Sequence, residues 1–544
     1  MALDTLFVNG NIYTLDPSRP KAHAIGVHQG RIISLDDELP PSVFSEVKDL
    51  AGATVLPGFQ DAHCHLTHIG QESMQVDIRP SAAPDKSALF NAIAQACQNA
   101  KPGEWVIGSG YNQNYLDGHH PTAVELDEVS FGHPVYLIHN SRHMGVANTK
   151  AFELSGFPER RGVPIPEGGD VPCENGQAVG LLLETARALI MDHIPPTTPE
   201  TVATMVEEGS RALAALGVTT ATDPGIGAPD HIGMCPQDLT GYQIARDSGR
   251  MSMRAIVMPY LTTLHPLAGL EYQGHPLYTL DLGLRTGLGD SWLRIGPTKV
   301  LSDGSLIGRS AAMREPYAHS DSTGLMQFSE EFLRERIIGA HLAGWDIAVH
   351  AIGDAALDSI MDIFEEAQSI LPRPARHRIE HVSVADDKQI ARLKQLGITP
   401  VPQGTFIPDL GEGASEAIGE DRASLVYRIG GFLRQDLQFA ASTDAPVVSA
   451  CPIRNIDAMV NRRTHLGREF NSEEKIMVEQ AIRAYTLGSA WANHVSDRGV
   501  INNGQLADFV LLSEDIYQVP AAHITDIAVT STFVDGKEVW NARW

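Results

Sequence analysis

The stretch AHLAGWDIAVHAIGD, residues 340–354, contains the pattern that organises most of this chain. Its first residues have the composition of a helix end, and Gly344 marks the point where that helix would stop. The apolar run that follows is short enough for a buried strand, and it finishes on polar residues, of which His350 is the first. This order predicts a helix that leads into a parallel β-strand.

The same unit recurs from about Thr201 onward. Three further junctions are ALAALGVTTATDPG (212–225), RLKQLGITPVPQG (392–404) and FLRQDLQFAASTDAP (432–446). Four more strands are predicted in VLPGFQDAHCH (55–65), MRAIVMPYL (253–261), WLRIGPTKVLSDG (292–304) and RHRIEHVSV (376–384). About eight strands separated mostly by helical segments predict an α/β protein, a (β/α)8 TIM barrel, whose chemistry gathers at the carboxyl ends of its strands.

The two ends of the chain have a different sequence pattern. TLFVNGNIYTL near the start and VTSTFVDGKEVWNA near the end both alternate apolar and polar residues around a turn signal, Asn-Gly in one and Asp-Gly in the other. We therefore expect residues 1–57 and 498–544 to pair into one small β-sandwich domain, built from both chain termini, beside a barrel of residues 58–497.

The segment between the first barrel strand and the second, at about 66–200, is too long to be a simple connection. It contains a predicted helix at Lys86–Asn99 and a predicted strand at Glu104–Gly108. We interpret it as an insertion after the first barrel strand. Such insertions often cover a site and shape substrate choice.

Composition narrows the class of partner and the compartment. The chain has 544 residues, 43% hydrophobic and 20% charged, a composition typical of a globular enzyme. Its formal net charge of -26 predicts that it binds neither nucleic acid nor a membrane. Five cysteines without CxxC spacing favour a reducing compartment. The N-terminus does not resemble a signal peptide, and no apolar run approaches the roughly 18 residues of a membrane span. A cytoplasmic enzyme acting on a small molecule is expected.

Polar side chains that could bind a metal stand at the predicted strand ends. His63 and His65 would share one face of an extended strand, because alternate residues point the same way. Taken in barrel order, the strand ends supply His63, His65, Lys299, His350, His381 and Asp444. This set suits one or two divalent cations, most simply zinc.

Each of these residues also has a structural alternative. His350 and His381 could be histidines of the core. Asp444 could cap the next helix, and Lys299 could lie on the surface, although its apolar neighbours indicate a buried strand where an unpaired ammonium is costly. Their occurrence together, in barrel order, favours the metal site.

The chain also resembles a known family. The motifs PGFQDAHCH, PTKVLSDGS, VHAIGD, RIEHV and STDAPV resemble those of the amidohydrolase superfamily, and in particular amidohydrolase family 3, the branch similar to N-substituted formamide deformylases. The similarity continues through AYTLGSAWA (484–492) and GQLADFVLL (504–512). It implies a barrel with a composite β-sandwich, and it implies that the metal ligands are His63, His65, His350, His381 and Asp444.

The same resemblance bears on the metal count and on assembly. In many relatives a lysine on the fourth strand is carboxylated and bridges two metals, which maps onto Lys299. The resemblance leaves one Zn2+ ion or two open, with another divalent metal as an alternative. It also implies a homodimer.

The family resemblance also implies which residues contact the substrate. His143 in SRHMGVAN resembles a histidine that faces the site and stabilises an oxyanion. Arg309 is expected either to face a substrate carboxylate or to pair with an acid, and Asp354 either to support His350 or, as we favour, to cap a helix. The remaining expected pocket residues are Tyr111, Asn112, Gln403 and Arg428.

The predicted activity is hydrolysis of a C–N bond other than a peptide bond, in an amide, N-acyl or N-formyl compound, by metal-activated hydroxide. Asp444 would accept the proton of the water and pass it to the leaving nitrogen. The alternatives are a cyclic amide, an ester, a carbamate or the deamination of a heterocycle at the same metal site, and a non-catalytic scaffold.

Overall fold

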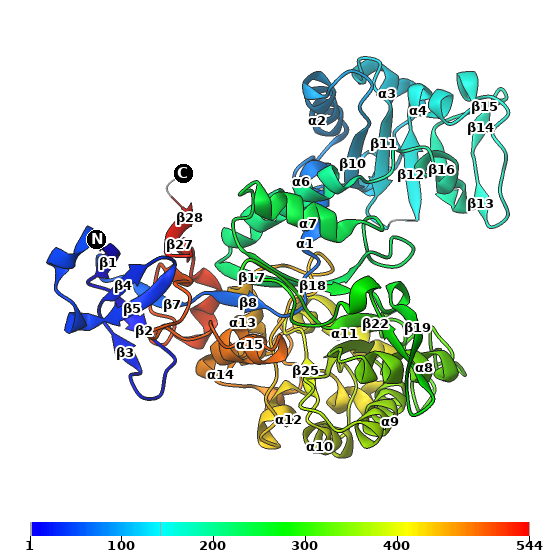
Figure 1. Ribbon diagram of the computed structural model, residues 1–544. Coiled ribbons are helices and arrows are strands. Elements are labelled where there is room, and N and C mark those ends of the chain that lie inside the picture. The colour runs from blue at the N-terminus through cyan, green and yellow to red at the C-terminus, as the bar shows by residue number, and fades with distance from the viewer. Residues whose placement is uncertain (1–2, 142, 543–544) are drawn as a thin grey trace. The chain divides into compact units, whose positions relative to one another are not determined.

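The computed structural model describes residues 3–141 and 143–542. The chain forms two compact units: residues up to Thr67 together with those from Thr198 onward, and residues His68–Thr197. The first unit holds two parallel sheets, and the second holds a mixed sheet of its own (Figure 1).

Two four-stranded parallel sheets lie in the first unit. One sheet has the order β21-β18-β17-β8 and the other the order β22-β23-β24-β25. Their bounds are β8 Phe59–Asp61, β17 Val218–Ile226, β18 Arg254–Pro259, β21 Leu293–Ile295, β22 Thr298–Leu301, β23 Ile347–Ala351, β24 Arg378–His381 and β25 Thr399–Val401. Nearly every residue of these strands is buried, as expected for parallel strands covered on both faces.

Backbone contacts join the two sheets at both edges. A parallel bridge links Tyr260, after β18, to Lys299 in β22, and another links Gln403, after β25, to Ser442. Hydrogen bonds then join residues 440–444 to β25 on one side and to the residues after β8 on the other. Parallel strands thus follow one another round a ring, and the fold is a mixed α/β fold of the TIM-barrel type.

Helices separate most of these strands in the chain. They are α6 Pro199–Ala214, α7 Asp238–Asp247, α8 Glu330–Leu342, α9 Asp354–Ile370, α10 Asp387–Leu396, α11 Phe406–Ile418, α12 Ile429–Arg434 and α13 Pro452–Asn461. The stretch 340–354 forms the end of α8, all of β23 and the start of α9, which confirms its predicted order. Gly344, between α8 and β23, has φ of +93°, a value that glycine adopts without strain.

Strands from the two chain ends pair with each other. A six-stranded sheet has the order β28-β27-β26-β7-β2-β3, so the C-terminal strands, red in Figure 1, border the N-terminal ones, blue. These strands are β2 Asn11–Tyr13, β3 Lys21–Ala22, β7 Thr54–Pro57, β26 Phe509–Leu512, β27 Val529–Val534 and β28 Lys537–Asn541. The rings of Phe7, Phe509 and Phe533 contact one another, with centroids 4.6–5.2 Å apart, so both ends of the chain share one core.

A second small sheet, built from the N-terminal segment alone, has the order β5-β4-β1-β6. Its strands are β1 Leu3–Val8, β4 Ile25–His28, β5 Arg31–Leu35 and β6 Phe44–Asp49. Phe7 and Ile25 of this sheet belong to the same hydrophobic cluster as Phe509 and Phe533 of the six-stranded sheet. The two terminal sheets therefore bury their apolar faces together.

The unit His68–Thr197 has a six-stranded sheet of order β13-β16-β12-β11-β10-β9. Besides β10, its strands are β9 Val76–Asp77, β11 Val135–His139, β12 Met144–Ala147, β13 Gly169–Asp170 and β16 Leu181–Glu184. Its helices include α2 Lys86–Asn99, which begins and ends where the sequence predicts, and α3 Ala123–Val129. The strand predicted at Glu104–Gly108 lies further along the chain, as β10 Val106–Tyr111. Lys101 and Glu104 are joined by backbone and side-chain hydrogen bonds in a turn, and the strand starts after that turn.

Within residues 3–141 and 143–542, none of the helices combines the length and the apolar character that crossing a membrane requires.

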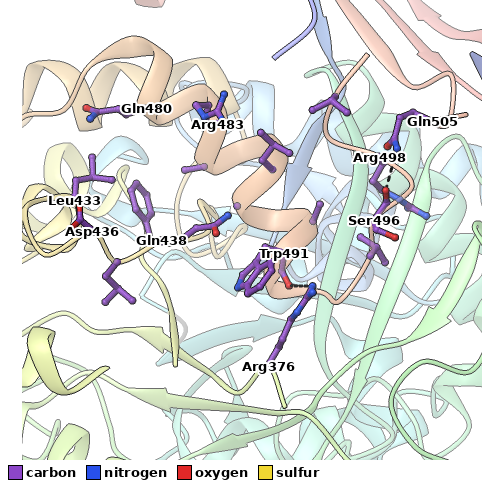
Figure 2. A pocket seen from close by; sticks show the side chains of 18 residues that line it. Arg376, Leu433, Asp436, Gln438, Gln480, Arg483, Trp491, Ser496, Arg498 and Gln505 are labelled. Atoms are coloured by element: carbon purple, nitrogen blue, oxygen red, sulfur yellow. Dashed lines mark hydrogen bonds between the residues drawn. The ribbon is translucent and has the colours of Figure 1, made fainter. Parts of the chain in front are cut away.

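A cavity of about 770 Å³ is lined by Arg376, by residues between Leu433 and Phe439 and by residues between Gln480 and Gln505 (Figure 2). Arg376, which precedes β24, borders it together with Phe439 and helix α15, Ser489–Ala492. The Arg376 guanidinium lies 3.8 Å from the centre of the Trp491 ring and donates to the Trp491 carbonyl. None of the described residues that line this cavity belongs to the predicted metal site.

Candidate metal centre

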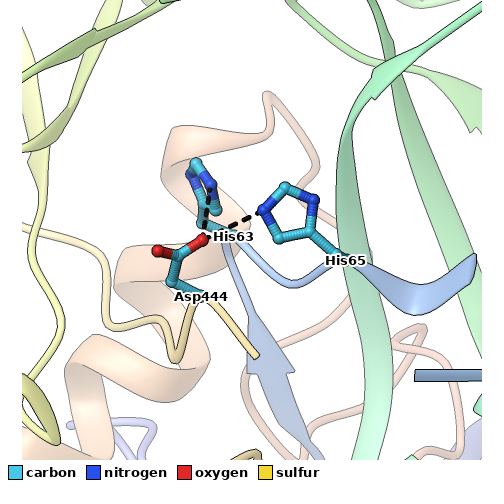
Figure 3. A group of neighbouring side chains, drawn as sticks. All are labelled: His63, His65 and Asp444. Atoms are coloured by element: carbon cyan, nitrogen blue, oxygen red, sulfur yellow. Dashed lines mark hydrogen bonds and ion pairs between the residues drawn. The ribbon is translucent and has the colours of Figure 1, made fainter. Parts of the chain in front are cut away.

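Two segments at the carboxyl ends of barrel strands bring together three side chains that could bind a metal. The backbone N–H of Asp444 donates to the carbonyl of His63 at 2.8 Å, and that of His65 donates to Ala445 at 2.9 Å. The Nε2 atoms of His63 and His65 consequently lie 3.3 Å and 3.1 Å from Oδ1 of Asp444 (Figure 3). One ligand atom from each residue lies within 4.8 Å of the others, a spacing suited to a shared cation.

A second cavity, of about 480 Å³, is lined by these three residues and also by the other three predicted donors. The ring centroids of His350 and His381 are 4.6 Å apart, and those of His63 and His381 are 5.2 Å apart. Lys299 lies at the same cavity, with 1% of its surface exposed. All six donors predicted from the strand ends are therefore neighbours.

The Lys299 amine has an unusual environment. Among the described residues it has no hydrogen-bond partner, although it is buried. Burial lowers the pKa of Lys299 to about 8, against a partial opposing effect of the negative charges of Glu380 and Asp444. Because a buried, unpartnered ammonium is costly, this environment fits a lysine that is chemically modified or that loses its proton more readily than usual.

The charges of Asp444 and His381 also suit metal ligands. Burial alone would raise the pKa of Asp444, but hydrogen bonds from His63 and His65 outweigh it and hold that pKa well below its usual range. Burial, aided by the neighbouring His350, lowers the pKa of His381 well below its usual range. An ionised carboxylate and a neutral imidazole are the forms that bind metals.

Two of these residues have a strained backbone. His381 has φ of +74° and Asp444 has φ of +60°, values that residues other than glycine rarely adopt. Each such conformation costs about 1–3 kcal/mol and is often found at functional sites, although exposed turn residues of this chain such as Asn9 and Gln29 also adopt it. The strain is consistent with a functional demand on where these two side chains point.

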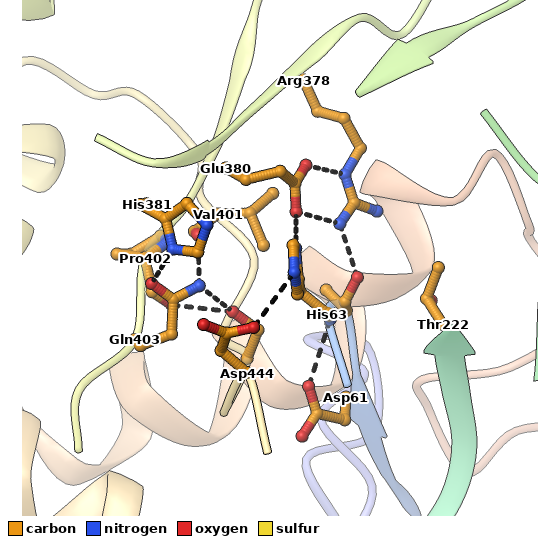
Figure 4. A network of polar contacts seen from close by, with 12 residues as sticks. Asp61, His63, Thr222, Arg378, Glu380, His381, Val401, Pro402, Gln403 and Asp444 are labelled. Carbon is orange, nitrogen blue, oxygen red and sulfur yellow. Dashed lines mark hydrogen bonds and ion pairs between the residues drawn. The ribbon is translucent and has the colours of Figure 1, made fainter. Parts of the chain in front are cut away.

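Glu380 and Arg378 are site residues that the sequence patterns missed. Glu380 accepts a hydrogen bond from Nδ1 of His63, and the Arg378 guanidinium donates to both Glu380 oxygens, at 2.6 and 2.8 Å (Figure 4). Both residues are fully buried. The sequence patterns point to the polar residue at the end of each strand, which is His381 here. Glu380 lies one residue earlier in the strand and is therefore not identified by them.

Gln403, expected to contact the substrate, contacts a predicted metal ligand, His381. Its Oε1 accepts a hydrogen bond from Nδ1 of His381 at 2.8 Å. Its amide nitrogen donates to the carbonyl of Val401 at 3.0 Å and to Oγ of Ser442 at 2.9 Å. Both ends of the amide are therefore engaged with protein groups.

The two predicted substrate arginines of this unit also have protein partners. Arg309 donates to the carbonyl of Ala318 at 3.0 Å. Arg428 donates to Glu474 and Asp387, each at 2.7 Å. Neither Arg309 nor Arg428 is among the described residues that line the cavity.

Asp354 lies at a helix start, but the favoured role as helix cap is wrong, because the N-cap of α9 is Gly353 and, among the described residues, no side chain caps the helix. Asp354 is the first residue of α9, and its Oδ1 accepts from the backbone N–H of Arg314 at 2.8 Å. A different acid, Asp303, lies 3.3 Å from Nε2 of His350.

Three predicted site residues belong to the unit His68–Thr197. Tyr111 is buried and its hydroxyl is hydrogen-bonded to His120 at 3.0 Å. Asn112 accepts from the backbone N–H of Asn114 at 3.0 Å, and the exposed His143 pairs with Glu184 at 2.9 Å. Their roles toward a substrate stay predictions.

The cavity around the donors has mostly apolar walls. Its lining includes Ile232, Leu301, Leu306, Ile307, Ile352, Phe406, Leu410, Tyr427 and Val447. Hydroxyl and amide groups are contributed by Ser305, Ser310, Gln327 and Ser383. An apolar enclosure with a cluster of polar donors on one side is typical of sites for small molecules.

Comparisons with known proteins agree with this arrangement. The model of the "Amidohydrolase family" matches residues 46–540. Protein LONG AFTER FAR-RED 3 of Arabidopsis thaliana is 30% identical, over 99% of this chain and 91% of its own length. The N-substituted formamide deformylase of Arthrobacter pascens is 27% identical, over 98% of this chain and 97% of its own.

A solved structure extends the similarity to the fold. An uncharacterized metal-dependent hydrolase from Pyrococcus horikoshii OT3 has a TM-score of 0.76 and 26% identity, covering 95% of this chain and 99% of that one. The family match spans every barrel strand that carries a predicted donor, and it confirms the resemblance seen in the motifs. The chain therefore belongs to the amidohydrolase family and is related to metal-dependent hydrolases over nearly its whole length.

Proposed function

We propose that the protein hydrolyses a C–N bond of the amide type, in an amide, N-acyl or N-formyl compound rather than in a peptide. The observation that carries this proposal is the convergence of His63 and His65 on Asp444, at 3.3 and 3.1 Å, in a cavity with apolar walls. The similarity to an enzyme named for deformylating N-substituted formamides supports this bond class.

The donor set fits one or two Zn2+ ions, with another divalent metal as the alternative. When bound, such an ion polarises a carbonyl group and lowers the pKa of a water molecule. The residues proposed to hold it are His63, His65, His350, His381 and Asp444, joined by Lys299 in a two-metal site. Carboxylation of Lys299 would replace a costly buried cation by an anionic oxygen ligand, which is why its unpartnered amine supports this modification.

Asp444 is the residue that we assign to proton transfer. Its carboxylate is ionised, because hydrogen bonds from two histidines hold its pKa well below the usual range despite burial. Both histidines contact Oδ1, so we assign to Oδ2 the proton of the attacking water. Asp444 then delivers this proton to the leaving nitrogen, acting first as general base and then as general acid.

The remaining contacts to the substrate are proposals from the family resemblance. His143 would stabilise the oxyanion that forms at the attacked carbonyl. The proposed substrate-binding residues are Tyr111, Asn112, Arg309, Gln403 and Arg428. For Arg309, Gln403 and Arg428, contact with a substrate would require the side chain to exchange present protein partners.

We also propose the domain boundaries that accompany this site. Residues 58–497 form a metal-dependent (β/α)8 barrel with an insertion at about 66–200, and residues 1–57 and 498–544 form a composite β-sandwich. The ring of parallel strands and the pairing of β7 with β26 support this division. A cytoplasmic homodimer is proposed with it; the five free cysteines support a reducing compartment.

A substrate screen with the Zn2+-loaded protein tests the proposed bond class. The panel contains N-formyl and N-acyl amines, cyclic amides, esters, carbamates and amino-substituted heterocycles, with the Asp444→Asn variant as the blank. Turnover of acyclic amides that is lost in this variant supports the proposal. Turnover confined to one of the other classes would reassign the reaction, and no turnover by a fully loaded protein would favour a scaffold.

A further inference from the structure

The second nitrogens of two predicted ligands meet different kinds of acceptor. Nδ1 of His63 donates to Glu380, a carboxylate, whereas Nδ1 of His381 donates to the neutral amide oxygen of Gln403 at 2.8 Å (Figure 4). In each neutral ring this bond leaves the lone pair on Nε2, so a metal bound by His63 would replace the contact of its Nε2 with Oδ1 of Asp444 at 3.3 Å. A carboxylate acceptor also raises the basicity of a ligating imidazole, and a neutral acceptor does so less.

Glu380 is held in place by a buried cation. Arg378 donates to its Oε1 at 2.6 Å and to its Oε2 at 2.8 Å. Arg378 also donates to Asn493 at 3.1 Å and to the carbonyl of Ala62, which immediately precedes His63. One guanidinium thus fixes both the carboxylate behind His63 and the backbone before it.

Gln403 has no comparable charge. Its amide nitrogen donates to Val401 and Ser442, so its oxygen must face His381. The two histidines therefore adopt the same tautomer, but Nδ1 of His63 donates to a carboxylate and Nδ1 of His381 donates to a neutral amide.

His350 is the neighbour of His381 at this side of the cluster. Its Nε2 lies 3.1 Å from the carbonyl of Gly304 and 3.3 Å from Asp303. The Asp303 carboxylate already accepts from three backbone N–H groups, those of Ala312, Ile352 and Gly353, at 2.8–3.1 Å. Its charge is thereby shared among several donors.

We propose that Glu380, held by Arg378, is a positioning residue for a metal site with two halves. The half formed by His63, His65 and Asp444 binds a metal ion more tightly because of Glu380, and it is filled first. The half-site of His350 and His381, backed by Gln403, fills second. This inference rests on the metal centre of the proposed function and goes further, because it assigns an order of filling and the residue that sets it.

The test is a Zn2+ titration of the metal-stripped full chain against a chromophoric chelator. It compares the wild type with two isosteric exchanges, Glu380→Gln and Gln403→Glu. We expect Glu380→Gln to weaken binding of the first Zn2+ by about 10- to 100-fold. Gln403→Glu should leave the first dissociation constant unchanged and tighten the second.

Opposite outcomes overturn the inference. An unchanged first dissociation constant in Glu380→Gln contradicts it, and so does a Gln403→Glu variant that tightens the first Zn2+. A thermal melt accompanies each titration because Glu380→Gln leaves Arg378 without its counter-charge; if that variant does not fold, Gln403→Glu alone decides between the two orders. Failure of the wild type to bind Zn2+ would instead remove the metal centre itself.

Discussion

His65 Nε2 lies 3.1 Å from Asp444 Oδ1, although 379 positions separate the two residues in the chain. The contact exists because the first parallel strand and the last strand segment are neighbours, joined by backbone hydrogen bonds between His63 and Asp444 and between His65 and Ala445. The proposed metal centre therefore depends on the closure of the ring of strands as much as on its side chains.

Asp444→Asn should separate catalysis from metal binding. The amide keeps the size of the side chain and one oxygen donor but cannot accept the proton of water, so turnover should fall by about 10²- to 10⁴-fold. Zn2+ content, measured by elemental analysis, should largely persist. Asp281→Asn is the matched control, because the Asp281 side chain is 87% exposed. Full activity in Asp444→Asn would refute the assignment.

Lys299→Met should stabilise the metal-free protein while impairing the metal-loaded one. The amine is buried without a hydrogen-bond partner among the described residues, so its removal relieves a desolvation cost. We expect a higher melting temperature without metal and a lower Zn2+ content after loading. Lys394→Met, at a half-exposed lysine paired with Asp436, serves as control. A lower melting temperature in metal-free Lys299→Met would show that the buried amine does not destabilise the folded protein.

A buried pair of histidines should make the fold sensitive to acid. The Nδ1 of His377 accepts from the backbone N–H of Ile347, and its Nε2 is hydrogen-bonded to Nδ1 of His341 at 2.8 Å. Nε2 of His341 then donates to the carbonyl of Leu371. Every nitrogen of the pair has one fixed role, and adding a proton to either ring would place two donors face to face.

Burial lowers the pKa of both His341 and His377 in the folded state. Their stabilising contribution is therefore complete above the unfolded pKa of about 6.5 and declines as the pH falls below it. His377→Gln should be less stable than the wild type at neutral pH but should lose less melting temperature on acidification. The exposed His265→Gln should retain the wild-type pH dependence, and equal acid sensitivity of His377→Gln and wild type would contradict this account.

The shared core of the chain ends should be energetically important. Phe509 stacks on Phe533 and meets Phe7 edge-on, and all three are buried. Phe509→Ala should reduce the free energy of unfolding by about 3–5 kcal/mol, the usual cost of removing a buried phenylalanine. Denaturant unfolding measures this, with Val47→Ala at a half-exposed position as control. A loss as small as that of the control would mean that the two ends are held together elsewhere.

The sequence predicted the six donors because each stands at the end of an apolar strand, and a parallel barrel gathers such ends at one mouth. His63 and His65 followed from the two-residue period of a strand, and His350 from the helix-to-strand pattern of residues 340–354. The pairing of the chain ends could be expected in the same way, from matching alternation and turn signals.

The partners behind the donors could not be predicted by these rules. Glu380 and Arg378 lie within a buried strand, where charged residues are rarely expected, and only the packing of β24 against the residues after β8 reveals that they face His63. Gln403 was placed near the site, but its role depends on the direction of one amide, which no local pattern specifies. The roles of Tyr111, Asn112 and His143 stay predictions.

The most direct test of the central claim is the divalent metal content of freshly prepared protein that has met no chelator, measured by elemental analysis together with the double variant His63→Asn/His65→Asn. We predict one or two metal ions per chain in the wild type and a clear loss in the double variant, with the fold retained by circular dichroism. A wild type without bound metal, or a double variant with full metal content, would contradict a metal centre at this cluster.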